Sequence, residues 1–152
     1  MLKGKYLIGF FIIFMLTCSW CAVDSIKEEE KTVIKVVEQF FSVLENRDSE
    51  LAKEILVAGG AAFSTRKSED QSRTMRRVSF KDLVESLGKS TERMKEKMTG
   101  PKVMIHRDIA VLWAPYKFYI NGSFSHHGVD AFSLVKMKGK WRIATIVYTV
   151  EK

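Results

Sequence analysis

The chain has 152 residues, of which 46% are hydrophobic and 28% are charged, and this length and composition are typical of one globular domain. The formal net charge is +7, but Phe80 is the only aromatic residue in the basic stretch 66–102. Because nucleic-acid-binding surfaces usually combine aromatic side chains with Lys and Arg, the sequence argues against a nucleic-acid partner.

The N-terminus has the layout of a secretory signal peptide. Lys3 and Lys5 precede an apolar run over 6–16, and small residues follow up to Cys21. The run is shorter than the roughly 20 residues that cross a bilayer, so no stable membrane span is predicted. We expect a signal peptide over 1–21 and a mature domain over 22–152, exported to the periplasm or secreted. A retained membrane anchor is the alternative.

Both cysteines, Cys18 and Cys21, lie in this segment. Their C-x-x-C spacing is that of a redox pair, but cleavage after Cys21 would remove both. The mature domain would then have no disulfide, no thiol nucleophile and no thiolate metal site, and it would depend on its hydrophobic core.

A first helix is predicted over 25–46. It begins at a capping box made by Ser25 and Glu28, and apolar residues recur at intervals of three and four along it. Its apolar face is made by Val33, Val37, Phe40, Phe41 and Leu44.

Two shorter helices follow. Asp48 is expected to cap the second helix, which contains Leu56 and stops at Gly59-Gly60. Residues 64–77 are polar and are predicted to form an exposed loop. Ser79 caps a third helix that ends at Gly88.

The periodicity then changes to that of antiparallel strands. They are predicted over 93–98 (in preference to a short helix), 102–106, 109–120, 124–136 and 141–150. Pro115 predicts a bulge in the third strand, because proline cannot donate to the ladder. Helices followed by a long antiparallel sheet give an α+β fold, and a sheet that curls over helices leaves a natural ligand pocket.

Hairpin turns at Asn121-Gly122 and Lys138-Gly139 set the expected register. It pairs Trp113 with Asp130 and Lys117 with His126. The face predicted to cover the helices contains Val111, Trp113, Tyr119, Phe124, His126, Asp130, Phe132, Leu134, Trp141, Ile143 and Val147. The opposite face is smaller but still apolar, which predicts a homodimer through the sheet. A bulge at Pro115 would exchange the faces of the strand before it.

The segments 113–119, 121–122, 124–132 and 141–143 together resemble the nuclear-transport-factor-2-like (NTF2-like) superfamily. More narrowly, they resemble its SnoaL-like and lumazine-binding branch, and the resemblance covers nearly all of 25–150. It implies a cone of curved antiparallel sheet packed on N-terminal helices around a pocket, often in a dimer. It does not specify a reaction, because isomerases, dehydratases, cyclases and non-catalytic binding modules all belong to the superfamily.

Asp130 is the sharpest site candidate, because it is predicted in the middle of an apolar strand face. Desolvation there would raise the pKa of its carboxyl group, as suits a general acid or base. The resemblance implies the same role, since catalytic members of the superfamily use a pocket Asp. The alternative is a structural carboxylate that accepts a hydrogen bond from the Trp113 indole or from backbone.

His126 is the second catalytic candidate, because it is predicted on the same face and titrates near neutral pH. It cannot contact Asp130, since four residues along a strand span about 13 Å; the two side chains could only flank one ligand. Trp113, Tyr119 and Phe132 are predicted to stack on a planar ligand beside them, the alternative being plain core.

No metal and no cofactor are predicted, because the chain contains neither a metal-ligand motif nor a nucleotide-binding loop. Three functions stay open. One is an exported protein that binds a small hydrophobic or aromatic molecule. Another is an acid–base pocket enzyme, such as an isomerase or dehydratase, that uses Asp130 and His126. The third is a non-catalytic dimeric interaction module whose pocket is filled by Trp113 and Phe132.

Overall fold

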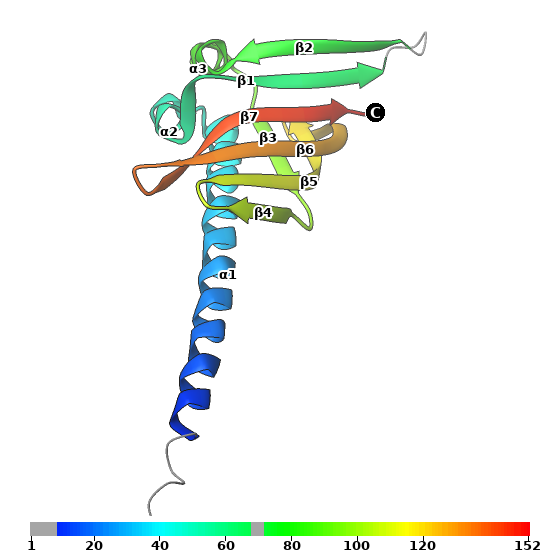
Figure 1. Ribbon diagram of the computed structural model, residues 1–152. Coiled ribbons are helices and arrows are strands. Elements are labelled where there is room, and N and C mark those ends of the chain that lie inside the picture. The colour runs from blue at the N-terminus through cyan, green and yellow to red at the C-terminus, as the bar shows by residue number, and fades with distance from the viewer. Residues whose placement is uncertain (1–8, 68–71) are drawn as a thin grey trace, which may run out of the picture.

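The computed structural model describes the backbone of residues 9–67 and 72–152 and the side chains of 26–67 and 72–152. The elements are α1 (Gly9–Asn46), α2 (Ser49–Ile55), β1 (Leu56–Lys67), β2 (Arg73–Ser79), α3 (Phe80–Leu87), β3 (Met94–Met98), β4 (Lys102–His106), β5 (Ile109–Ile120), β6 (Ser123–Met137) and β7 (Lys140–Val150). This is the predicted α+β class, with a curved and mainly antiparallel sheet packed on helices (Figure 1).

The predicted signal peptide lies outside the part of the chain whose side chains are described, so its cleavage stays a prediction. In Figure 1 the sheet lies in front of α1, and the N-terminal part of α1 extends beyond the sheet. Within the described residues, no helix combines the length and the apolar character needed to cross a membrane.

The core lies between α1 and the concave face of the sheet. All five residues predicted for the apolar face of this helix are buried, and so is Val43. Burying each such side chain contributes about 1.5–3 kcal/mol. After α1 ends, Arg47 has a positive φ of 58°. The Asp48 carboxylate then caps α2 as predicted, accepting from the backbone N–H groups of Glu50 and Leu51.

The predicted exposed loop over 64–77 is wrong, because β1 and β2 form an antiparallel hairpin there. Leu56, expected in the second helix, instead begins β1. The strand pairs in parallel with β7, which follows it by more than 70 residues in the sequence. Gly60 allows this contact, since a Cβ atom there would lie 2.5 Å from the Ala144 carbonyl oxygen and from the Phe80 ring.

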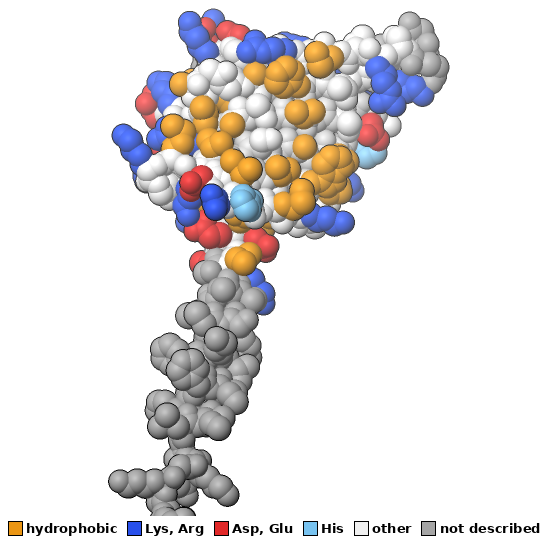
Figure 2. Space-filling model, viewed as in Figure 1, with side chains coloured by type: hydrophobic (Ala, Val, Ile, Leu, Met, Phe, Trp, Pro, Cys, Tyr) orange, Lys and Arg blue, Asp and Glu red, His pale blue; other side chains and the backbone are white. Residues whose placement is uncertain are grey.

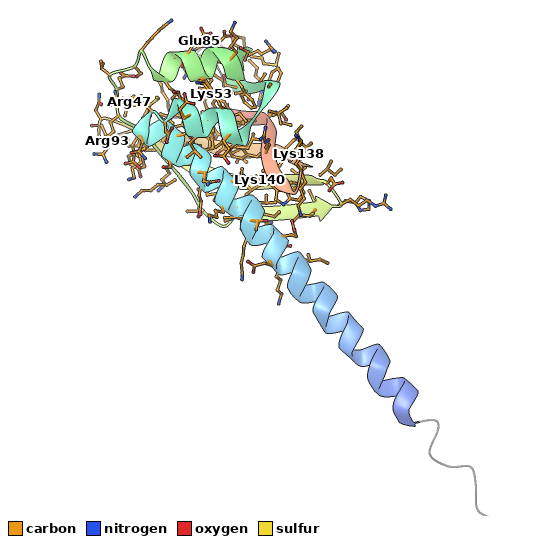
Figure 3. All side chains as sticks on the ribbon, turned by 90° about the vertical axis from the view of Figure 1, so that its left-hand side faces the viewer. Arg47, Lys53, Glu85, Arg93, Lys138 and Lys140 are labelled. Atoms are coloured by element: carbon orange, nitrogen blue, oxygen red, sulfur yellow. The ribbon has the colours of Figure 1, made fainter. Side chains whose placement is uncertain are left out.

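The strand order is β2-β1-β7-β6-β5-β3, and β4 also pairs with β5. β3 and β4 lie end to end along β5, since β3 pairs with residues 116–120 and β4 with residues 109–113. Ion pairs hold β3 against the end of α1, because Arg93 and Lys95 both donate to the Glu45 carboxylate at 2.8 and 2.9 Å. Arg47 and Arg93 are labelled at this end of the helix in Figure 3.

The predicted turns are present, but two irregularities change the register. Ile120 pairs with Ser123 as expected. The register shifts between Tyr119 and Phe118, and every pair from Phe118 back to Ile109 is displaced by one residue. Trp113 therefore pairs with Ala131, and Asp130 with Ala114. The second shift, between β6 and β7, pairs Asp130 with Tyr148 instead of Val147.

The predicted bulge at Pro115 is wrong, because this residue keeps regular pairing with Val129. Its carbonyl oxygen accepts from the Thr99 N–H at 2.9 Å, just after β3 ends. Its missing N–H therefore lies beside the break between β3 and β4, where a continuous neighbouring strand is not needed.

The shifts exchange the faces of β5, since side chains alternate along a strand. His126, Asp130, Phe132, Leu134, Trp141 and Ile143 are on the concave face as predicted. The placement of Val111, Trp113, Tyr119, Phe124 and Val147 on that face is wrong. Their places are taken by Ala110, Leu112, Ala114, Tyr116, Ile146 and Tyr148. Figure 2 shows hydrophobic side chains gathered over the outer face, where Trp113 is 51% exposed.

Candidate functional site

A cavity of about 280 Å³ lies between the concave face of the sheet and helices α1 and α3. Most of its wall is apolar or aromatic. Its lining residues are Phe40, Leu44, Ala62, Leu83, Met94, Glu96, Tyr116, Phe118, His126, Asp130, Phe132, Ile146 and Tyr148. The volume is close to the lower end of the range for ligand pockets.

Two carboxyl groups meet in this apolar wall. Asp130, only 2% exposed, comes from β6, and Glu96 comes from β3. A side-chain hydrogen bond joins them, and it lowers the pKa of Asp130 while it raises that of Glu96. Glu96 is therefore the protonated member and donates to the Asp130 carboxylate.

Burial is the main cause of both pKa shifts. It raises the pKa of Asp130 from 3.8 to about 6, and it raises the pKa of Glu96 well above its ordinary value. The negative charge of Asp130 raises the pKa of Glu96 further. The pair thus shares a proton at a pH where ordinary Asp and Glu side chains are both ionised.

One oxygen of the pair has no partner. Asp130 Oδ2 is buried and accepts no hydrogen bond from the protein. The predicted structural partner, the Trp113 indole, lies on the opposite face of the sheet and cannot supply one. A buried carboxylate oxygen without a donor costs free energy, and here it lines a cavity that a donor could enter.

The curl of the sheet brings the two carboxyl groups together. Glu96 pairs with Phe118, which pairs with His126, and His126 is four residues before Asp130. In a flat sheet this places the Cα atoms of Glu96 and Asp130 more than about 15 Å apart. Only a strongly curved sheet closes that distance, and the ion pairs to Glu45 hold β3 in the curved position.

Tyr116 lies beside the pair and is itself buried. Its hydroxyl donates to the Thr149 carbonyl oxygen at 2.7 Å. Burial, and then the charge of Asp130, raise the pKa of its phenol, so the ring stays neutral. Gly128, which pairs with Tyr116, has no side chain because a Cβ atom there would overlap Thr149.

His126 lines the same cavity as Asp130. Its ring stacks on Phe118, with centroids 4.8 Å apart, and its Nδ1 lies 3.0 Å from Ser125 Oγ. Burial, with Arg66 as a further cause, lowers the pKa of His126, so the imidazole is neutral at pH 7. Across the described side chains no hydrogen bond joins it to Asp130, in agreement with the predicted separation.

The predicted stacking residues divide between two places. Phe132 lines the cavity and packs edge-on against Phe40 and Phe41. Trp113 and Tyr119 lie outside it, contrary to the predicted register. Tyr119 instead lines an open surface depression of about 610 Å³, together with Lys97 and Arg93. None of the described residues that line this depression is a buried titratable group, so the smaller cavity is the stronger candidate site.

Glu96 is the site residue that sequence reasoning missed. Its neighbours Lys95 and Lys97 make the segment look like a solvated edge, although the alternation with Met94 and Met98 places Glu96 on an apolar face. The described residues contain no group of three or more His, Cys, Asp or Glu side chains that could hold a metal ion.

Comparison with known proteins identifies related sequences and folds. Residues 28–149 match the protein family described as "putative lumazine-binding". No curated protein matches the sequence.

Several solved structures share the fold. A function-unknown protein from Mycobacterium tuberculosis superposes with a TM-score of 0.69 at 16% identity, covering 86% of this chain and 76% of that one. An NTF2-like protein from Cytophaga hutchinsonii gives 0.66 at 10% identity, covering 80% and 97%. One with a cystatin-like fold from Novosphingobium aromaticivorans gives 0.66 at 11%, covering 86% and 87%. At these identities the likeness concerns the fold alone.

Proposed function

Because the chain belongs to the "putative lumazine-binding" family of NTF2-like proteins, we propose that it is an exported protein that binds a small molecule in the cavity of its concave face. The observation that carries the proposal is the unpartnered, buried Asp130 Oδ2 in an aromatic wall. A polar group of this kind in an apolar pocket is the usual means by which a binding site orients its ligand.

The first test is native mass spectrometry of the purified protein. We expect a noncovalent adduct, or a new one after addition of lumazine, the compound named in the family description. Asp130→Asn should weaken the adduct, whereas Asp108→Asn, an exposed turn residue, should retain it. A wild-type protein free of adduct with and without lumazine, and with no other small molecule bound, would contradict the proposal.

Export is the second part of the proposal and has its own test. It rests on the charged start and short apolar run at the N-terminus. The mass of the protein recovered from the producing cell should correspond to a chain that begins at Ala22. A full-length mass in a membrane fraction would favour the retained anchor.

Acid–base catalysis is the second candidate function. The observation that favours it is the raised pKa of Asp130, about 6, which suits proton transfer near neutral pH. His126 lines the same cavity and would be the second group. An enzyme of this kind should lose turnover in Asp130→Asn while it still binds its substrate, whereas a binding protein should show no turnover of its retained ligand.

We also propose that the outer face of the sheet forms a homodimer. Trp113, Val111 and Val147 lie exposed on this face, at 51%, 37% and 46%, and apolar groups gathered on one face favour association. The interaction-module alternative needs a pocket filled by Trp113, and that side chain lies on the other face. Light scattering of the purified protein should give the mass of two chains.

A further inference from the structure

We propose that the ligand carries a protonated nitrogen, so that the cavity selects a small organic cation with an aromatic or aliphatic body. This inference rests on the proposed binding function, and it names the chemical class of the ligand. It depends on three features of the wall: an orphaned carboxylate oxygen, a second carboxyl group beside it and the absence of any lining cation.

The two carboxyl groups favour a ligand that donates a hydrogen bond over one that only accepts hydrogen bonds. Asp130 is nine-tenths buried or more, and its Oδ2 has no hydrogen-bond partner. A ligand N–H group would supply the missing donor. A ligand carboxylate or phosphate would instead bring a second negative charge to the same apolar site, which is strongly unfavourable.

The rest of the wall supplies no positive charge that could hold an anion, since Arg66, which lowers the pKa of His126, is not among the lining residues. None of the lining residues among those described is Lys or Arg. Helices α1 and α3 contribute Phe40, Leu44 and Leu83, and β1 contributes Ala62. This acidic cavity lies in a chain whose formal net charge is +7, so the sign of the site is opposite to the net charge of the sequence.

Aromatic groups complete the recognition of a cation. Tyr116, Phe118 and Phe132 line the cavity from two adjacent strands, and Tyr148 lines it from β7. The faces of such rings attract ammonium groups, an effect that grows when the cation is desolvated. The cavity volume of about 280 Å³ equals about nine water molecules, which leaves room for an amine with a small ring system.

Several titratable groups face the bound nitrogen and set its pH dependence. Glu96 on β3 holds its proton more tightly than an ordinary Glu side chain, and the phenol of Tyr116 on β5 stays neutral. Asp130 must be ionised to bind a cation. His126 becomes charged only in acid and then opposes binding, so both groups weaken cation binding as the pH falls.

The experiment compares three probes of the same shape and different charge by isothermal titration calorimetry: 2-phenylethylamine, 2-phenylethanol and phenylacetate. The amine should bind about 10- to 100-fold more tightly than the alcohol, since hydrogen bonds to charged groups are the strong ones. Phenylacetate should bind more weakly still. The amine should bind about tenfold more weakly at pH 5 than at pH 7, because the pKa of Asp130 is about 6.

Two variants and a control make the result specific to the site. Asp130→Asn should reduce the amine to the affinity of the alcohol and leave only the weaker pH dependence that His126 causes. Glu96→Gln, which keeps a donor to Asp130, should retain the preference for the amine, and so should Asp108→Asn. Circular dichroism shows whether each variant is folded.

Equal binding of the amine and the alcohol, or tighter binding of phenylacetate, would overturn the inference. So would an amine preference that survives in folded Asp130→Asn. These outcomes leave the binding function intact if lumazine or a retained molecule occupies the cavity. Failure of every probe, with lumazine and retained molecules also unbound, would overturn both.

Discussion

Replacing Asp130 by Asn should make the protein more stable at pH 7, although it changes a buried residue of the core. The substitution keeps the size of the side chain and removes its ability to ionise. The amide oxygen of Asn can still accept the hydrogen bond from Glu96. What is lost is a negative charge that the apolar cavity destabilises.

The magnitude follows from the pKa of Asp130. Its ordinary value is 3.8 and its value in the folded protein is about 6, a difference of about 2 pKa units, or about 3 kcal/mol. The folded protein holds the proton of the Asp130 carboxyl group more tightly than the unfolded chain does. The stability that this protonation gives the wild type is therefore fully present below pH 3.8 and is lost as the pH rises through about 6. We expect Asp130→Asn to exceed the wild type by about 1–3 kcal/mol at pH 7, after allowance for a weaker bond to Glu96.

The assay is urea unfolding of both proteins between pH 4 and pH 8, with Asp108→Asn as the control. The difference between wild type and variant reports the Asp130–Glu96 pair, whose pKa values depend on each other, because the remaining titrating groups are common to both proteins. It should be close to zero at pH 4 and grow to its full size by pH 7. A variant that is less stable than the wild type by the same amount at every pH would show that the carboxylate is structural and refute this reasoning.

Three further predictions concern other parts of the fold. Gly128→Ala should lower the free energy of unfolding by about 1–3 kcal/mol, because the new Cβ atom would overlap Thr149. Trp113→Glu should convert the proposed dimer to a monomer in light scattering, because it places a charge on the apolar outer face. Glu29→Gln should cost about 1 kcal/mol at pH 7, a value discounted because Glu29 is 38% exposed; it weakens the bond from Trp141 Nε1 at 2.8 Å. Hydrogen bonds, from Lys136 first and then Trp141, lower the pKa of Glu29, so its contribution is present above its unfolded pKa and fades as the pH falls through the lowered value.

Each of these has a matched control and a contradicting result. Gly88→Ala adds a Cβ atom with 3.9 Å of clearance and should be neutral; equal effects at both glycines would contradict the crowding at Thr149. Met75→Glu, which is exposed on β2, should leave the dimer intact; loss of the dimer in both variants would argue against the sheet face. Glu28→Gln should change stability less than Glu29→Gln, and a deficit for the latter that persists unchanged in acid would disprove the assignment to the charge of Glu29.

Local features of the fold were predictable from the sequence. The caps at Asp48 and Ser79 use a side chain and backbone groups two or three residues away, and the Asn121-Gly122 turn needs only its own two residues with positive φ. The apolar periodicity of 33–44 likewise identifies the buried side of α1. None of these depends on a distant part of the chain.

The missed features depend on distant contacts or on a single inserted residue. β1 forms against β7, and no pattern within 56–67 identifies a partner so far along the chain. One extra residue in β6, Ser125, lies opposite the step from Phe118 to Tyr119 and reverses the orientation of β5 relative to Asp130, which moved Trp113 from the expected pocket to the surface. The Glu96–Asp130 pair forms only because the sheet curls, so spacing along the sequence could not reveal it.

The most direct test of the site is ¹³C NMR titration of the carboxyl groups of Asp130 and Glu96, with and without 2-phenylethylamine. We predict that Asp130 titrates with a pKa near 6 in the free protein, that Glu96 stays protonated beyond it, and that the amine lowers the pKa of Asp130. A pKa near 3.8 for Asp130, unchanged by the amine or by any molecule retained from the cell, would contradict a buried, proton-sharing ligand site.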